Sequence, residues 1–380
     1  MKIFFVMTPA YNPIKGGVQR ATSKTGKYLF ENGYQVWYYS LSNEGNVTSE
    51  HGTVLNAPNI DGVQNIEDIK PEMVINQMSS VKLLRNFLAK QRDILGYKLI
   101  GCLHNSLFKV KNNINQVAKE ALPSFLFNVL NNKLGMKIAF QYFKFNFSVR
   151  LKDIINKHDY YVLLAPPNKN ELEYYIGKYK PEKIHWIPNS IEPSNNADLV
   201  KEKVIVHVGR IETSQKKSDL LLPIWKLVQQ KLPDWKFVVV GDGPYKKTME
   251  EQIEKENIKN VTLTGFQNPE PYFQKGAIFL MTSSFEGFPN VILEAQSFGA
   301  VTVAFNTYEV LPWLVNKEDS IIVAPYDLEA IASEIVSLAN DQIRLSKMAE
   351  ASVKNIERFT LENVGKQWVD FVNSIKNKNE

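Results

Sequence analysis

The chain of 380 residues contains one cysteine, Cys102, and this scarcity excludes two kinds of structural support. No disulfide can form within the chain, and a zinc site built from several cysteines is excluded as well. A reducing compartment fits this composition. Four of the five histidines show no metal-binding spacing either: His51, His158, His185 and His207.

Long apolar runs are also missing. Nothing approaches 18 consecutive apolar residues, so we expect no transmembrane helix. The short apolar run in residues 1–7 is too brief for a secretory signal and predicts a buried first strand instead. Internal repeats and low-complexity tracts are absent from the sequence. We therefore expect a cytoplasmic protein.

Composition is otherwise ordinary, with 44% apolar and 22% charged residues. These values are typical of globular chains. The length favours two or three domains, each able to bury a core of its own.

Positive charge is concentrated in one segment. The net charge is +5, but residues 81–157 carry 14 Lys and Arg against three acidic residues, which leaves this segment at +11 and the rest at −6. Residues 121–149 are also rich in aromatic side chains. Basic residues interleaved with aromatics suit a helix that lies on an anionic bilayer, which would be a peripheral membrane contact. They also suit a helix that grips a lipid-linked acceptor. A helical hairpin packed on its own domain remains the alternative, and RNA binding is the interpretation that we set aside.

Apolar strands alternate with amphipathic helices along the whole chain, which predicts α/β domains with parallel sheets. In the first half we expect strands at 2–7, 35–40, 73–77, 98–103, 160–165 and 183–187, and helices at 17–32 and 169–176. A polar stretch at 189–198 predicts a linker.

The second half restarts the same pattern. We expect strands at 204–208, 236–240, 261–264, 278–282, 301–304 and 321–323. Helices are expected at 218–230, 245–256, 289–298, 328–339, 342–358 and 361–375.

The segment 283–295 places two carboxylates, Glu286 and Glu294, eight residues apart around a predicted helix start. Gly287 frees the turn and Pro289 suits a first helical residue, because proline has no N–H to lose there. Such a helix start can bind a phosphate or diphosphate. A glycosidase acid and nucleophile pair is disfavoured. Eight residues of one helix span about 12 Å, whereas such pairs lie about 5–9.5 Å apart.

This Glu-x7-Glu pattern after an apolar strand resembles the signature of family 4 retaining glycosyltransferases with the GT-B fold. Gly-Phe-Pro after the first glutamate is similar to bacterial members that use UDP-sugars. The resemblance implies two Rossmann-like parallel-sheet domains facing each other across a cleft. Residues 1–190 would bind the acceptor, with a helix in 360–380 crossing back onto them, and residues 200–359 would bind the nucleotide sugar.

The loop 209–222 resembles the Arg and Lys segment with which this family clamps the donor diphosphate. Arg210 and Lys216 match it, although the loop is about one residue longer and the usual glycine after the lysine is replaced. Lys217 remains the alternative to Lys216. Fixed cations here would stabilise the charge that develops on a departing UDP.

Several glycines fall in turns where the resemblance implies donor contacts. Gly16 and Gly17 follow the first strand, and adjacent glycines let a backbone approach a ligand at a helix start. Gly241 and Gly243 form a turn that would line the nucleoside pocket, and backbone groups of the segment 264–266, which includes Gly265, would meet the base. The dinucleotide fingerprint Gly-x-Gly-x-x-Gly is absent.

By resemblance, Glu286 orients the donor sugar, Glu294 holds the ribose hydroxyls, and His104 lies on the acceptor side. The N–H groups of residues 288–291 would face sugar and phosphate, except at Pro289. The predicted catalytic residues are Glu286, Arg210 and Lys216. The predicted donor-binding residues are Gly16, Gly17, Gly209, Lys217, Gly241, Gly243, Gly265, Phe266, Gly287, Phe288, Pro289, Asn290, Val291 and Glu294.

The chain also lacks any Asp-x-Asp pair, with which glycosyltransferases of the other main fold hold a divalent cation. We therefore expect a metal-independent enzyme without a cofactor. It would move a hexose or N-acetylhexosamine from a UDP-sugar to the hydroxyl of a glycan or lipid-linked saccharide in bacterial polysaccharide biosynthesis. A UDP-sugar epimerase of the same fold and a non-catalytic nucleotide-binding protein are the alternatives.

Overall fold

The computed structural model describes residues 1–8, 11–12, 16–41, 49–57, 64–194 and 201–377. The chain divides into two compact units, called here the first and second domains. The first domain comprises Met1–Leu107, Asn132–Ser190 and Phe359–Glu380. The second comprises Phe108–Asn131 and Ile191–Arg358. Residues 108–131 thus group with the second domain, although the sequence placed all of 1–190 in the first; the predicted linker lies partly outside the described residues.

A seven-stranded sheet forms the centre of the first domain, in the order β3-β2-β1-β4-β5-β6-β7. All of its neighbouring strands pair in parallel. The strands are β1 (Lys2–Met7), β2 (Gln35–Leu41), β3 (Thr53–Ala57), β4 (Met73–Asn76), β5 (Lys98–Cys102), β6 (Tyr160–Leu163) and β7 (Ile184–Trp186). The apolar run of β1 is buried from Ile3 to Met7, as expected of a parallel strand that is covered on both faces.

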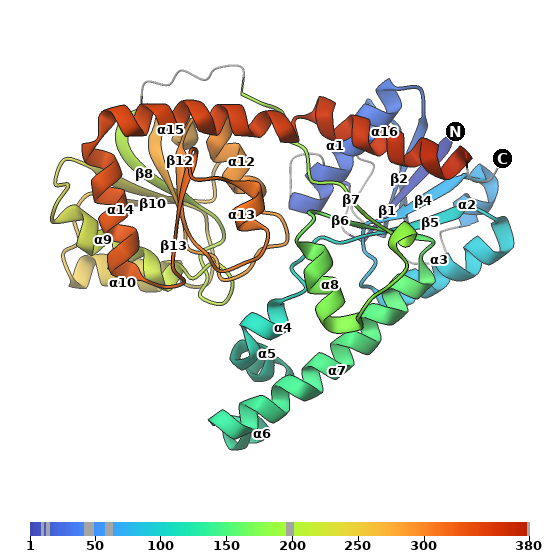
Figure 1. The fold of residues 1–380 in the computed structure, drawn as a ribbon, viewed down its shortest axis with the longest axis horizontal. Helices are drawn as coiled ribbons and strands as arrows, with labels where there is room; N and C mark the ends of the chain where they lie inside the picture. The colour runs from blue at the N-terminus through green and yellow to red at the C-terminus, as the bar shows by residue number, and fades with distance from the viewer. Residues whose placement is uncertain (9–10, 13–15, 42–48, 58–63, 195–200, 378–380) are drawn as a thin grey trace. The chain divides into compact units, whose positions relative to one another are not determined.

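Helices cover both faces of this sheet (Figure 1). They are α1 (Gly17–Glu31), α2 (Gln64–Ile69), α3 (Lys82–Leu95), α7 (Lys133–Lys157), α8 (Asn168–Ile176) and α16 (Leu361–Asn377). The last helix lies beside α1 in Figure 1, and its Trp368 and Phe371 join Ile3 and Phe5 in one core cluster. The C-terminal helix therefore completes the core that the N-terminal strand begins.

The second domain has a six-stranded parallel sheet in the order β10-β9-β8-β11-β12-β13. Its strands are β8 (Glu202–Val208), β9 (Lys236–Val240), β10 (Val261–Gly265), β11 (Gly276–Met281), β12 (Val301–Phe305) and β13 (Ser320–Val323). Counted from β8, this is the Rossmann order 3-2-1-4-5-6. The order reverses between β8 and β11, and ligands of such sheets bind at that switch point, beyond the carboxyl ends of the strands.

Helices of the second domain fall into two sequence groups. The first is α4 (Lys109–Asn112), α5 (Ile114–Ala121) and α6 (Ser124–Leu130). The second is α9 (Leu221–Gln229), α10 (Lys246–Lys255), α11 (Glu270–Lys275), α12 (Asn290–Ser297), α13 (Leu311–Leu314), α14 (Leu328–Asn340) and α15 (Gln342–Asn355). Asp327 and Asp341 cap α14 and α15 by accepting backbone N–H groups at 2.9 Å.

Every strand predicted from the sequence is present, with ends that differ by one or two residues. The prediction gave no bounds for β3, for the helices of the first half between residues 64 and 157, or for the short helices α11 and α13. It also placed Pro289 as the first helical residue, whereas Pro289 stands at the N-cap and α12 begins at Asn290. Among the described residues, no helix is long and apolar enough to cross a membrane.

Candidate active site

Two loops meet at the switch point of the second domain. The loop 209–217 leaves β8, and the segment 282–286 leaves β11. The Ser284 N–H donates to the Gln215 carbonyl at 2.7 Å, and the Thr282 hydroxyl donates to the Lys216 carbonyl at 2.8 Å. These bonds fix the two loops side by side, so the functional groups that they carry come together.

The predicted catalytic residues Lys216 and Glu286 form an ion pair in this place. The Lys216 Nζ to Glu286 Oε1 distance is 2.7 Å, and the two side chains are only 18% and 10% exposed. The side-chain amide of Gln215 donates to the other carboxylate oxygen of Glu286 at 3.0 Å and to the Phe285 carbonyl at 3.1 Å. Pairing and hydrogen bonds together offset the cost of burying this carboxylate.

Gln215 contacts Glu286, although the sequence analysis did not single it out. It stands directly before Lys216, in the loop that is about one residue longer than the common form of the motif. That extra length was the available signal, because an inserted residue beside Lys216 can reach the same carboxylate.

Glu212 holds the backbone of the loop 209–217, called here the basic loop. Its carboxylate accepts the backbone N–H groups of Ser214, Gln215 and Lys216 at 2.7 to 3.0 Å. Burial acts to raise the pKa of Glu212, but the hydrogen bonds from Ser214 and these N–H groups outweigh it and hold the pKa below its usual value. Glu212 is therefore ionised at neutral pH and keeps the loop in one conformation.

Arg210 lies apart from the Lys216–Glu286 pair. Its side chain is 64% exposed, and its guanidinium is 4.0 Å from the Glu212 carboxylate. The structure thus brings Lys216 and Glu286 into contact but leaves Arg210 extended at the surface of the same loop.

Lys217 has a left-handed backbone with φ +52°, a conformation that favours glycine. This explains why the related motif carries glycine at the position after its lysine: Lys217 occupies that glycine position. Lys216, and not Lys217, makes the contact with Glu286. The assignment of Lys216 as the phosphate lysine fits this geometry and stays a prediction.

Gly241 and Gly243 are required by close backbone packing. Their φ values are +148° and +158°, and a Cβ would lie 1.8 Å from the Gly209 carbonyl oxygen and 2.3 Å from the Ile211 oxygen, respectively. The Ile211 N–H donates to the Asp242 carbonyl at 2.9 Å. This turn therefore shapes the start of the basic loop, whatever it contributes to a ligand.

The end of β10 completes this edge of the sheet. The Gly241 N–H donates to the Gly265 carbonyl at 2.9 Å, and Gly265 has φ +75°. The next residue, Phe266, is 80% exposed. The segment 264–266 thus lies at the carboxyl edge of the second sheet, and the contact of its backbone groups with a base stays a prediction.

The start of α12 differs from the prediction in one N–H group. The Asn290 N–H donates to the Phe288 carbonyl at 3.0 Å, so it is already engaged within the chain. Gly287 and Phe288 are buried, while Val291 is half-buried in the first turn. Glu294 lies one turn further along α12 and is half-buried.

A buried polar network anchors α12 from its other end. The Gln296 amide donates to the Asp319 carboxylate at 2.9 Å, and the Asn355 amide donates to the Gln296 carbonyl oxygen at 3.0 Å. Burial raises the pKa of Asp319. Because this network ties α12 to α15 and to the start of β13, it fixes the position of the helix within the second domain.

His207 and Tyr308 stand near the pair without having been predicted there. Burial is the main cause that lowers the pKa of His207 to about 4, and the neighbouring Lys216 lowers it further. Its Nδ1–H donates to the Leu280 carbonyl at 3.0 Å. The Tyr308 pKa is raised well above its ordinary value, first by burial and then by Glu286. Both side chains are therefore neutral at physiological pH.

The segment 108–131 also approaches the Glu286 loop within the second domain. The Lys109 ammonium lies 5.8 Å from the ring centroid of Phe285. The Asn112 amide donates to the Thr307 carbonyl at 3.3 Å. Residues from the first half of the sequence thus reach the neighbourhood of Glu286, which no local pattern indicated.

In the first domain, His104 follows β5 and contacts the Gln77 side chain, with 2.6 Å between Nε2 and Oε1. Burial lowers the pKa of His104 to about 4. Gly16 is the N-cap of α1 with φ +74°, and Gly17 begins that helix. The preceding part of the predicted glycine loop, 13–15, lies outside the described residues.

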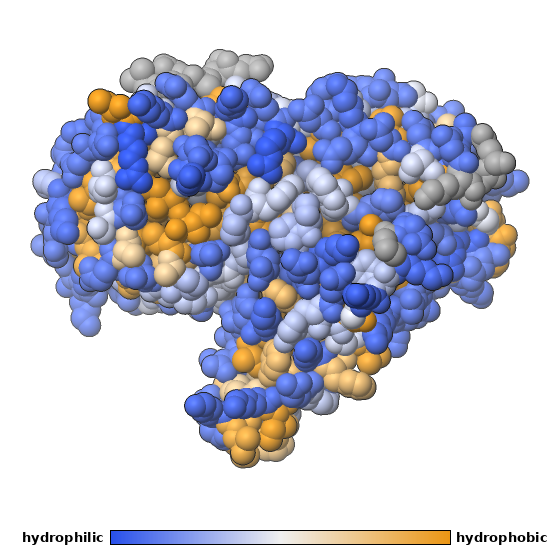
Figure 2. Space-filling model, viewed as in Figure 1, coloured by the Kyte–Doolittle hydropathy of each residue, from blue (hydrophilic) through white to orange (hydrophobic). Residues whose placement is uncertain are grey.

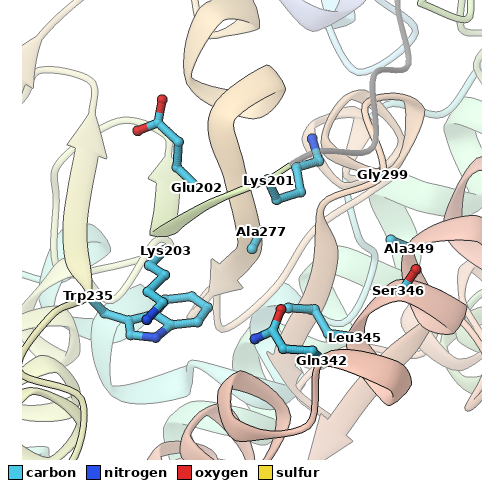
Figure 3. A pocket seen from close by; sticks show the side chains of 10 residues that line it. All are labelled: Lys201, Glu202, Lys203, Trp235, Ala277, Gly299, Gln342, Leu345, Ser346 and Ala349. Carbon is cyan, nitrogen blue, oxygen red and sulfur yellow. The ribbon is translucent and has the colours of Figure 1, made fainter.

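A separate cavity of about 90 Å³ lies at the opposite edge of the second sheet, where β8 and β11 begin (Figure 3). Its lysines are engaged: Lys201 donates to the Phe273 and Gln274 carbonyls, and Lys203 pairs with Asp234. It is therefore not part of the candidate site. Nowhere in the described ranges do three or more His, Cys, Asp or Glu side chains gather as a metal site.

Most of the second domain matches a known family. Residues 202–341 match the model of the family described as glycosyl transferases group 1. The match covers 140 of the 380 residues, all of them within the second domain.

Two curated proteins are similar to this chain over much of its length. It is 26% identical over 303 residues to an uncharacterized glycosyltransferase of Haemophilus influenzae, a match that covers 71% of this chain and 82% of the relative. It is 29% identical over 224 residues to the amylovoran biosynthesis glycosyltransferase AmsD of Erwinia amylovora. That second match covers 58% of this chain and 61% of AmsD, which is less than two thirds of that relative.

The fold has solved counterparts. Anabaena Alr3699/HepE in complex with UDP has a TM-score of 0.74 and 16% identity, and the match covers 98% of this chain and 100% of that one. The two parallel-sheet domains of this chain are therefore those of the GT-B fold, as the sequence predicted.

Proposed function

We propose that this protein is a glycosyltransferase of the retaining family 4. In our proposal it moves a hexose or N-acetylhexosamine from a UDP-sugar to the hydroxyl of a glycan or lipid-linked saccharide, in the cytoplasm, during polysaccharide biosynthesis. The observation that carries the proposal is the Lys216–Glu286 pair at the switch point of the second domain's sheet. HepE, which has the same fold, has been crystallised with UDP.

Each side chain has a role that its place supports. Lys216 and the exposed Arg210 would balance the charge of the donor diphosphate, so the reaction needs no metal ion or cofactor. Glu286, held by Lys216 and Gln215, would accept hydrogen bonds from hydroxyl groups of the donor sugar. Glu294 would accept hydrogen bonds from the hydroxyl groups of the ribose.

The reaction proceeds on one face of the sugar. The acceptor oxygen forms a bond to the anomeric carbon while the bond from that carbon to the β-phosphate oxygen breaks. The departing phosphate takes the acceptor's proton, and the electron pair of the broken bond stays on UDP. None of the charged side chains described at the site is needed as a covalent nucleophile in this scheme.

The test combines a donor panel with one substitution. Purified protein is incubated with UDP-hexoses and UDP-N-acetylhexosamines and an oligosaccharide acceptor, with and without EDTA, and UDP release and the anomeric configuration of the product are measured. We expect turnover with one UDP-sugar, unaffected by EDTA, and a retained configuration. Glu286→Gln should lower kcat by about 100-fold or more, the order seen when one positioned polar group is lost from an active site.

Glu251→Gln is the matched control, because Glu251 is an exposed glutamate on α10 of the same domain. It should leave the rate unchanged. A fully active Glu286→Gln protein or an inverted product would overturn the proposal. Conversion of the UDP-sugar without acceptor would favour an epimerase, and UDP binding without turnover would favour a non-catalytic protein.

A further inference from the structure

The helix α7 (Lys133–Lys157) is apolar on two sides, and only one of them is covered. Its inner side packs on α3 and α8 of the first domain through buried residues that include Ala139, Leu151 and Ile154. Phe147 stacks edge-on against Tyr175 of α8. This side anchors the helix in the domain.

The outer side carries a row of five large side chains that solvent reaches. They are Leu134, Ile138, Tyr142, Phe145 and Val149, called here the α7 stripe, and each is between 53% and 69% exposed. Steps of four, four, three and four residues place them on one face of the helix. The stripe spans about 22 Å along the helix axis.

A row of this kind differs from ordinary surface exposure. Single apolar side chains are common on protein surfaces, but a contiguous apolar patch marks an interaction site. The apolar stripe of a surface helix normally faces the core of its own domain, but the second apolar side of α7 faces solvent. The α7 stripe therefore lacks the partner that its composition calls for.

The charges beside the stripe indicate the kind of partner. α7 has six basic residues and one acidic residue, Asp153. Lys133 and Lys137 directly precede the stripe residues Leu134 and Ile138, and both are exposed. In the lower part of Figure 2, where Figure 1 shows α7, apolar and hydrophilic residues lie next to one another on the surface.

We propose that the α7 stripe docks on an anionic lipid bilayer. The apolar row would enter the boundary between headgroups and acyl chains, while Lys133, Lys137 and Lys152 reach anionic headgroups with their flexible stems. A second copy of the chain fits less well, because it would bring two strongly basic helices together. The proposal does not depend on which sugar the enzyme transfers.

The experiment is vesicle flotation of the full chain without nucleotide. Vesicles of phosphatidylcholine alone are compared with vesicles that also contain phosphatidylglycerol, at low and high salt. We expect binding to the anionic vesicles, weakened by salt, and little binding to the neutral ones. Lys133→Gln with Lys137→Gln should lower the partition coefficient about 25-fold at low salt, since each surface lysine changes it about five-fold.

The apolar arm of the test uses Ile138→Ser with Phe145→Ser. Both positions are exposed, so the fold should persist, and circular dichroism checks it. Partitioning should fall at least about ten-fold. Ile343→Ser and Lys347→Gln on α15 are the matched controls, because both residues are exposed on the second domain, and they should bind vesicles like the wild type.

Three results would overturn the proposal. Wild-type protein that does not float with anionic vesicles is the first, and stripe variants that float as well as the wild type are the second. The third is a dimer, seen by sedimentation velocity, that Ile138→Ser with Phe145→Ser abolishes without any vesicle binding. A shift of labelled RNA by protein that ignores vesicles would instead favour a nucleic-acid surface.

Discussion

At the scale of single residues, the site depends on which lysine faces Glu286. Two adjacent lysines follow Gln215, and their side chains cannot be told apart by residue type. Their settings differ. Lys217 has φ +52°, a backbone conformation that is strained for any residue with a Cβ. Lys216 pairs with the Glu286 carboxylate at 2.7 Å.

Replacing each lysine in turn separates the two roles. Lys217→Gly relieves the left-handed backbone, so we expect a gain of up to about 1 kcal/mol in the free energy of unfolding with the transfer rate retained. Lys216→Gln should keep the fold and lose most of the rate. Urea unfolding and initial rates measure the two effects. Loss of activity in Lys217→Gly comparable to that in Lys216→Gln would move the phosphate role to Lys217.

At the scale of elements, the site is shaped by turns that bring backbones together. The 241–243 turn presses against the basic loop so closely that a Cβ at Gly241 would lie 1.8 Å from the Gly209 carbonyl oxygen. The Gln296–Asp319–Asn355 network plays a similar part for α12. The turn positions the loop that carries Lys216, and the network positions the helix that carries Glu294.

Gly241→Ala should therefore destabilise the protein by more than a positive φ alone would. Gly33→Ala is the control, because Gly33 has φ +83° but nothing within 4 Å of its would-be Cβ. We expect a loss of about 1 kcal/mol in the free energy of unfolding for Gly33→Ala, and of about 3 kcal/mol or more for Gly241→Ala. If urea titrations gave equal losses of unfolding free energy for the two variants, the close contact at Gly241 would contribute nothing to the destabilisation.

At the scale of the whole molecule, buried histidines make stability depend on pH. Burial is the main cause that lowers the pKa of His158 to about 4, as it does for His104 and His207. His158 Nδ1–H donates to the Ile154 carbonyl at 2.7 Å, and its Nε2 accepts from the Asn76 amide at 3.1 Å. The neutral ring is thus the form that the fold accommodates.

The sign of the effect follows from this. The unfolded chain binds protons on these histidines below pH 6.5, whereas the folded chain resists them down to about pH 4, so stability is lost as pH falls through that window. We expect a loss on the order of 2 kcal/mol per histidine near the acid end. Thermal melts between pH 7 and pH 4.5 measure it, and the melting temperature of His158→Gln should fall less steeply than that of the wild type. Parallel slopes would contradict this assignment.

The sequence by itself determined the elements and the motif. Apolar runs predicted the parallel strands, because this signal is local and follows the period of the backbone. Glu286-x7-Glu294 indicated the candidate site through its resemblance to a family signature. The strand β3 was missed because residues 53–57 form a short run beside a sparsely patterned stretch. The start of α12 was misplaced by one residue, since proline suits both an N-cap neighbour and a first turn.

Only the tertiary structure decided which groups meet. The Lys216–Glu286 contact joins residues 70 positions apart, and the Asn112–Thr307 bond joins residues 195 positions apart. The support from Gln215, the grouping of 108–131 with the second domain and the solvent exposure of the α7 stripe are of the same kind. Such contacts are fixed by how strands are ordered and helices packed, and no local pattern of residues encodes them.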